Sequence, residues 1–256
     1  MQGSLIEKIV QTALKNPSAE AFVYKDQVVN YQQLYRRICQ YAKALHTQGI
    51  TSGDAVGISI SQSPLHPVVM LALARLGAIS VPINPIFPAD IKSRIIEKYT
   101  LKVILTDLEN PRVEGASLIR LQGLSLDDNA NDLDFISYQP DADTPLLIAI
   151  PLLMSMSSGA REPKAIMYSN RYMIERMQKT VIECSRSTRM IPANLNFTMG
   201  YICTLGLLSL GGTIIFPDST KAADVIKTIN GHKVTNVFFS SEAATAIDTV
   251  LPAGRI

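Results

Sequence analysis

Segments of helical and of strand periodicity alternate along most of this chain, and this alternation limits the folds that it can adopt. Apolar runs expected to form strands lie at 55–60, 78–83 and 102–106, and segments of helical period lie between them, at about 65–76 and 89–99. Parallel strands need such crossover connections, which place helices over the faces of a sheet. The sequence therefore predicts an α/β fold with mostly parallel sheets flanked by helices.

The remaining segments continue this pattern toward both ends. Asn30 followed by Gln33 is typical of a helix N-cap, and Gly49 and Gly77 stand where helices should stop. Before residue 55 we expect a short amphipathic helix within residues 1–17, a hairpin of strands 21–24 and 28–31, and a long helix after Asn30. After residue 144 we expect strands at 145–156, 164–169, 189–193, 213–216 and 236–241, and helices at 170–185, 198–209, 221–230 and 242–250.

Residues 107–145 interrupt the alternation. They include the polar, acidic stretch 127–134 and one expected strand at 117–121. An acidic run of this kind is typical of a solvated surface loop. We therefore expect a possible subdomain break within 107–145.

Charge and cysteine content argue against several classes of function. Twenty-four Lys and Arg residues against 22 Asp and Glu residues leave a formal net charge of +2, and no dense basic stripe is present, so nucleic acid is not an expected partner. The three cysteines are an odd number without metal-ligand spacing, which indicates buried, reduced thiols. Glu7 and Lys8 interrupt the apolar core that a signal peptide needs, so we expect a cytoplasmic protein.

The long uncharged run and the three histidines indicate neither a membrane span nor a metal site. Residues 191–217 contain no charged residue and are long enough to cross a bilayer, but Asn194, Asn196 and the pair Gly211-Gly212 divide them into a core helix and a buried strand. We expect no membrane span. The three histidines are scattered, without a carboxylate or nucleophile at a diagnostic spacing, so we expect neither a hydrolytic triad nor a metal site.

One hydroxyl-rich loop between two expected strands has the composition of a phosphate-binding site. Ser157 and Ser158 offer hydroxyl groups, Gly159 lets main-chain N–H groups approach an anion, and Arg161 and Lys164 add positive charge. The pattern matches neither the Walker A loop nor the Rossmann fingerprint. Composition alone favours the other interpretation, a surface hairpin that carries two solvated cations.

The stretch SSGAREPKAI (157–166) resembles the phosphate-loop motif of the adenylate-forming superfamily, [ST]-S-G-[ST]-T-G-x-P-K-G. That superfamily comprises acyl-CoA synthetases, luciferases and nonribosomal adenylation domains. Other segments resemble its motifs in the same order: NYQQLYRRICQYAKAL, GITSGDAVGISISQS, LALARLGAISVPINPIFPADIKSRII, KVILTD, LGGTIIF and KVTNVFF. The resemblance implies that residues 1–256 are a partial N-terminal domain, the front part of the large domain of an acyl-CoA synthetase.

The resemblance also implies an activity and its site residues. A carboxylic acid would react with ATP and Mg²⁺ to give an acyl-adenylate and pyrophosphate, and a thiol of coenzyme A or of a carrier protein would then take the acyl group. The ATP phosphates are assigned to Ser157, Ser158, Gly159, Arg161 and Lys164, and the acid pocket to Asn194, Asn196, Phe197 and Gly200. Phe197 lies at a strand–helix joint, where an aromatic side chain more often packs inward.

Departures from the family pattern leave a second reading open. The loop is one residue shorter than the motif and lacks its second glycine, Ala160 and Arg161 replace hydroxyl residues, and Asn170 stands where a histidine is frequent. Arg161 either compensates as a cation or blocks the site. The family's catalytic lysine and ribose-binding aspartate belong to later segments, which would be supplied in cis or in trans, so we expect the isolated chain to be incompletely active. The alternatives are a degenerate, non-catalytic binding or assembly module, and generic small-molecule binding by the sheet.

Overall fold

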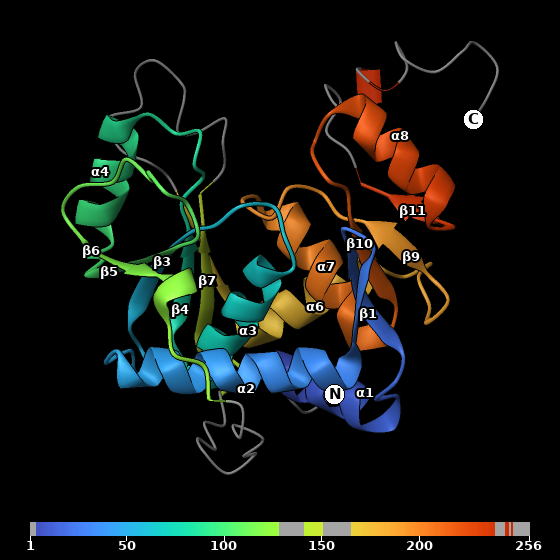
Figure 1. Cartoon of the computed structure of the whole chain (residues 1–256). Coiled ribbons are helices and arrows are strands. Elements are labelled where there is room, and N and C mark those ends of the chain that lie inside the picture. The colour runs from blue at the N-terminus through green and yellow to red at the C-terminus, as the bar shows by residue number, and fades with distance from the viewer. Residues whose placement is uncertain (1–3, 128–140, 151–164, 239–243, 246, 248–256) are drawn as a thin grey trace.

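Strands and helices alternate in the structure, and the strands form two sheets (Figure 1). The computed structural model describes residues 4–127, 141–150, 165–238, 244–245 and 247. Among these residues the β1–β2 and β7–β8 pairs are antiparallel and all other strand pairs are parallel. The predicted α/β class with mostly parallel sheets is therefore confirmed.

The five-stranded sheet has the order β11-β9-β10-β1-β2, and the six-stranded sheet has the order β6-β5-β3-β4-β7-β8. The first contains β1 (Glu20–Tyr24), β2 (Gln27–Asn30), β9 (Arg189–Ile191), β10 (Thr213–Phe216) and β11 (Asn236–Val237). The second contains β3 (Ala55–Ser59), β4 (Ile79–Pro82), β5 (Val103–Thr106), β6 (Ser117–Arg120), β7 (Pro145–Ala149) and β8 (Ile166–Ser169). The described helices are α1 (Leu5–Lys15), α2 (Tyr31–Thr47), α3 (Leu65–Leu76), α4 (Ala89–Lys98), α6 (Asn170–Thr180), α7 (Thr198–Leu210), α8 (Ala222–Gly231) and the short 3₁₀ turn η1 (Leu121–Gly123).

The elements stack in five layers, which Figure 1 shows from α4 on one side to α8 on the other. Helices α1, α2, α3, α6 and α7 contribute to one large apolar core that also takes residues from both sheets. Helix α4 covers the outer face of the six-stranded sheet, and α8 covers the outer face of the five-stranded sheet. Successive residues of one strand divide between these cores: Phe22 faces the inner helices and Val23 faces α8.

Local capping explains where several helices begin and end. Asn30 caps α2 in a capping box with Gln33, as predicted, and Ser4 caps α1 in the same way with Glu7. Helix α3 ends at Gly77, whose φ of 72° is the left-handed conformation that glycine adopts most easily. The expected stop near Gly49 is also found, since α2 ends at Thr47.

Some expected boundaries differ from those in the structure. Helix α6 ends at Thr180, five residues before the expected end at 185, and the next residue, Val181, is buried beside Gly206 of α7. Strand β11 spans only Asn236–Val237, and most of the expected helix 242–250 lies outside the described residues. The expected subdomain break within 107–145 stays a prediction.

Helix α7, which holds the middle of the uncharged run 191–217, is 13 residues long. Across the described residues, no helix combines the length and the apolar character that a bilayer crossing requires. Of the three free cysteines, Cys39 and Cys203 are buried and Cys184 is half-buried.

Tyr31 links the start of α2 to the end of α7. Its hydroxyl lies 2.8 Å from the carbonyl oxygen of Gly212 and 3.1 Å from that of Leu208, and burial raises its pKa well above the ordinary value.

We expect Tyr31→Phe to lower the free energy of unfolding by about 1–2 kcal/mol, because a buried carbonyl loses its donor. Urea denaturation measures this change. Tyr172→Phe, at a half-exposed ring, is the control, and equal stability of the two variants would contradict the prediction.

Candidate functional site

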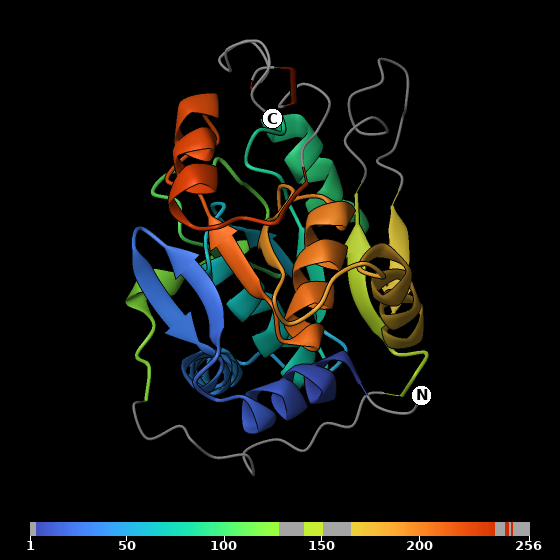
Figure 2. The same ribbon diagram turned by 90° about the vertical axis from the view of Figure 1, so that its right-hand side faces the viewer.

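The predicted phosphate loop joins β7 to β8. Strand β7 is parallel to β4, so the chain leaves β7 at the carboxyl edge of the parallel strands, where α/β folds bind ligands. Figure 2 shows β7 and β8 side by side, next to α6. Ser157, Ser158, Gly159, Arg161 and Lys164 lie outside the described residues. Their assignment to the ATP phosphates stays a prediction.

The predicted acid-pocket residues lie in the connection from β9 to α7. Asn194 is exposed, Asn196 is 8% exposed, Phe197 is half-buried at the start of α7, and Gly200 is buried in its first turn. The structure thus brings all four together at the carboxyl end of β9. Phe197 is half-buried, so its exposure is consistent both with a place in the acid pocket and with inward packing against the core.

The Asn194 side chain shapes this connection. Its Oδ1 accepts hydrogen bonds from the backbone N–H of Asn196 at 2.8 Å and from the Asn196 side-chain NH₂ at 3.1 Å. The amide of Asn196 is therefore oriented, because its opposite rotamer would place two oxygen atoms together. The Asn196 Oδ1 is buried and finds no hydrogen-bond partner within the described part of the chain.

Gly200 is required by a close approach of the backbone. A Cβ atom at this position would lie 2.3 Å from the carbonyl oxygen of Asn194 and 2.8 Å from that of Ala193. The first turn of α7 can therefore lie directly against the preceding loop only with glycine here.

Residues that sequence reasoning missed connect this loop to the six-stranded sheet. Gln62, in the connection from β3 to α3, donates from Nε2 to the Ala193 carbonyl at 3.2 Å and accepts at Oε1 from the Leu195 N–H at 2.8 Å. The neighbouring Ser61 donates from its backbone N–H, at 2.9 Å, and from its hydroxyl group to the two carboxylate oxygens of Asp107. The segments that meet here are distant in sequence, so no local pattern could identify them.

His66 and Tyr201 form a second, fully buried link between α3 and α7. The His66 Nε2 lies 2.9 Å from the Tyr201 hydroxyl oxygen, with the rings edge to face. Burial lowers the pKa of His66 to about 3 and raises that of Tyr201 well above its usual value, so both side chains are neutral at pH 7. No local pattern indicated a partner for this histidine, because the two residues are 135 positions apart.

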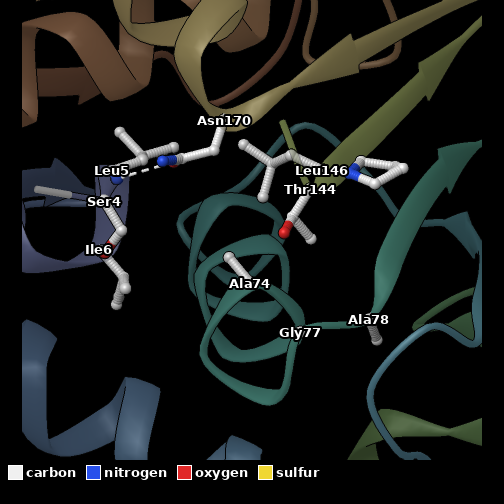
Figure 3. Close-up of a pocket in the computed structure, with 10 residues that line it drawn as sticks. Ser4, Leu5, Ile6, Ala74, Gly77, Ala78, Thr144, Leu146 and Asn170 are labelled. Atoms are coloured by element: carbon white, nitrogen blue, oxygen red, sulfur yellow. Dashed lines mark hydrogen bonds between the residues drawn. The ribbon is translucent and has the colours of Figure 1, made fainter. Parts of the chain in front are cut away.

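Two pockets of the structure contain none of the predicted site residues. The pocket in Figure 3 has about 10 Å³, room for roughly one water, and lies where Asn170 accepts a hydrogen bond from the Leu5 N–H at 2.9 Å. Asn170 therefore satisfies the N–H of the first residue of α1, at the opposite end of β8 from the predicted phosphate loop. The second pocket, of about 160 Å³, lies beside α8. Its lining includes the charge pairs Lys227–Asp218 and His232–Asp26.

A metal site is not assembled in the described part of the chain, where no three His, Cys, Asp or Glu side chains gather. Asp107, a carboxylate at the carboxyl edge, already accepts two hydrogen bonds from Ser61. Mg²⁺ in nucleotide sites is usually held by one or two carboxylates together with the phosphates, so a cluster of three side chains is not required. The expected use of Mg²⁺ stays a prediction.

Comparison with known proteins gives one consistent result. The family model described as AMP-binding enzyme matches residues 9–253. Tyrocidine synthase 3 from Brevibacillus parabrevis is 25% identical over 237 residues, covering 90% of this chain and 4% of the relative. This chain therefore spans only a small part of that relative.

Solved structures show the same fold at low sequence identity. Klebsiella oxytoca NpsA in complex with 3-hydroxyanthranilyl-AMSN is similar with a TM-score of 0.83 and 19% identity, over 98% of this chain and 50% of NpsA. O-succinylbenzoate coenzyme A synthetase from Bacillus subtilis, in complex with AMP, is similar with a TM-score of 0.82 and 17% identity, over 96% of this chain and 65% of that one.

We expect Gly200→Ala to destabilise the protein by about 1–3 kcal/mol, because the new methyl group would force the Asn194 backbone away from α7. Urea denaturation measures the loss. Gly123→Ala is the matched control, since a Cβ there meets nothing within 4 Å. A Gly200→Ala variant as stable as the Gly123→Ala variant would contradict the close approach.

His66 should make stability depend on pH. Above pH 6.5 the side chain is neutral in both states, but as the pH falls toward 3 it is protonated only in the unfolded chain. Stability should therefore fall with decreasing pH by up to about 1.4 kcal/mol per pH unit more in the wild type than in His66→Gln. Urea denaturation at several pH values between 7 and 4 measures both slopes, and parallel slopes would contradict this account.

Proposed function

Because the chain belongs to the AMP-binding enzyme family, we propose that it is the N-terminal part of an AMP-forming carboxylate ligase. The match over residues 9–253 carries this proposal, and the two structural likenesses support the corresponding fold. The chain spans half the length of NpsA. The complete reaction would therefore use segments that these 256 residues do not contain.

In the proposed reaction a carboxylate oxygen of the acid attacks the α-phosphorus of ATP. The new P–O bond gives an acyl-adenylate, and the bond to the β-phosphate breaks so that pyrophosphate leaves with the electron pair. A thiol, of coenzyme A or of a carrier protein, then attacks the acyl carbon, AMP leaves, and the thiol proton passes to solvent. Catalysis of this kind depends on orientation and on neutralising the phosphate charge.

The protein groups for this task would come from the loop between β7 and β8. Main-chain N–H groups near Gly159, hydroxyl groups of Ser157 and Ser158, and the cations Arg161 and Lys164 would bind the β- and γ-phosphates. Mg²⁺ bound with the ATP would supply further positive charge.

The acid would lie against Asn194, Asn196, Phe197 and Gly200. The buried Oδ1 of Asn196, which has no partner among the described residues, supports this placement, because an unpaired buried acceptor costs about 1–3 kcal/mol that a ligand donor could recover. A hydroxyl or amino group on the acid is a donor of the required kind. The oriented amide of Asn196 would then distinguish such acids from analogues that lack the donor.

A specific observation supports one alternative, a degenerate relative that acts as a binding or assembly module. The predicted phosphate loop is one residue shorter than the family motif and lacks its second glycine. Both changes remove backbone N–H groups or the freedom to point them at a phosphate. Pyrophosphate release, measured together with ATP binding, separates the two functions.

We expect ATP to raise the melting temperature of the wild-type chain, and Lys164→Met to weaken ATP binding by roughly 10- to 100-fold, because a charged hydrogen bond to phosphate is lost. Lys179→Met, at an exposed lysine of α6, is the matched control. Calorimetric titration with ATP measures both affinities.

The same preparation, supplemented with the C-terminal segments, should release pyrophosphate with at least one member of a carboxylic acid panel. ATP binding without any pyrophosphate release would favour the degenerate module. The proposed ligase function fails if the protein shows neither ATP-dependent stabilisation nor pyrophosphate release.

A further inference from the structure

The connection from β9 to α7 is held by a side chain from the other sheet. Gln62 follows β3, in the six-stranded sheet, and contacts residues that follow β9, in the five-stranded sheet. Its NH₂ group donates to the Ala193 carbonyl at 3.2 Å, and its carbonyl oxygen accepts from the Leu195 N–H at 2.8 Å. One side-chain amide thus satisfies two backbone groups on either side of Asn194.

A two-point attachment restrains both the position and the orientation of the segment that it binds. The side chain of Leu195 is fully buried, so the loop is anchored from inside the core as well. Between these anchors, Asn194 orients the Asn196 amide through two hydrogen bonds. The placement of the Asn196 Oδ1 therefore depends on a series of contacts that begins at Gln62.

We propose that Gln62 is a positioning residue for the acid-binding loop, so that selectivity for the acid depends on a side chain outside the pocket residues themselves. This inference rests on the proposed function for its ligand, but the attachment can be tested without any ligand. Gln62 has no direct role in the chemistry. It would act by holding Ala193 and Leu195, and through them Asn196, against the six-stranded sheet.

The ligand-free test is amide hydrogen exchange of the wild-type chain and of Gln62→Met, which keeps the side-chain length but neither hydrogen bond. We expect the Leu195 amide to exchange at least tenfold faster in the variant. Gln122→Met is the matched control, because Gln122 also donates to a backbone carbonyl at the carboxyl edge, that of Asp107, at 2.6 Å. Unchanged exchange at Leu195 in Gln62→Met would overturn the proposal.

Gln62→Glu provides a readout that a merely structural role would not change. Its carboxylate can still accept from the Leu195 N–H but faces the Ala193 carbonyl without a proton to donate, whereas the protonated acid restores both bonds. Protection of the Leu195 amide, relative to wild type at the same pH, should therefore rise as the pH falls from 7 to 4, through the ordinary pKa of a glutamic acid at about 4.3. A pH profile identical to that of the wild type would contradict the two-point attachment.

The ligand test uses 3-hydroxybenzoyl-sulfamoyladenosine, a stable mimic of an acyl-adenylate, with ATP as the reference. We expect Gln62→Met to bind the mimic at least fivefold more weakly and ATP within twofold of wild type, while Gln122→Met changes neither. Equal affinity of Gln62→Met and wild type for the mimic would overturn the positioning role. If the wild type binds neither compound, the proposed function fails, and the exchange experiment still decides whether Gln62 holds the loop.

Discussion

The structure depends on one apolar layer that both sheets share. Residues of five helices and of the inner faces of both sheets pack together in a single core. Burial of this kind is the main favourable term in folding. Because the layer is common, neither sheet can shift without disturbing the helices that also support the other, and the connections from β3 to α3 and from β9 to α7 keep their mutual positions.

That constraint explains how a site can be built from segments far apart in the chain. Gln62 and His66, which follow β3, contact the Ala193–Leu195 backbone and Tyr201, which follow β9. The cost is visible in the same place: the Asn196 Oδ1 is buried without a described partner. Most buried polar groups are hydrogen-bonded, so this oxygen calls for an explanation, which the proposed acid ligand would supply.

Two departures from the family pattern, Asn170 and the shortened loop, have different consequences because they lie at opposite ends of β8. Asn170, which stands where a histidine is frequent, accepts a hydrogen bond from the Leu5 N–H in the first turn of α1, at the edge opposite the predicted phosphate loop. The residue therefore has a structural role here. The predicted phosphate loop follows the carboxyl end of β7, so its missing glycine and hydroxyl groups would bear directly on the proposed phosphate binding.

The sequence by itself determined what depends on neighbours along the chain: the alternation of helices and strands, the α/β class, the Asn30 cap, the glycine stop at Gly77 and the likeness to a family. These features are local, because periodicity and capping involve residues a few positions apart. Only the tertiary structure decided that the loop of Asn194, Asn196 and Gly200 is held by Gln62, that His66 is paired with Tyr201, and that α6 ends at Thr180. Those outcomes depend on contacts between residues up to 135 positions apart, which are specified by packing and leave no signal in the local pattern.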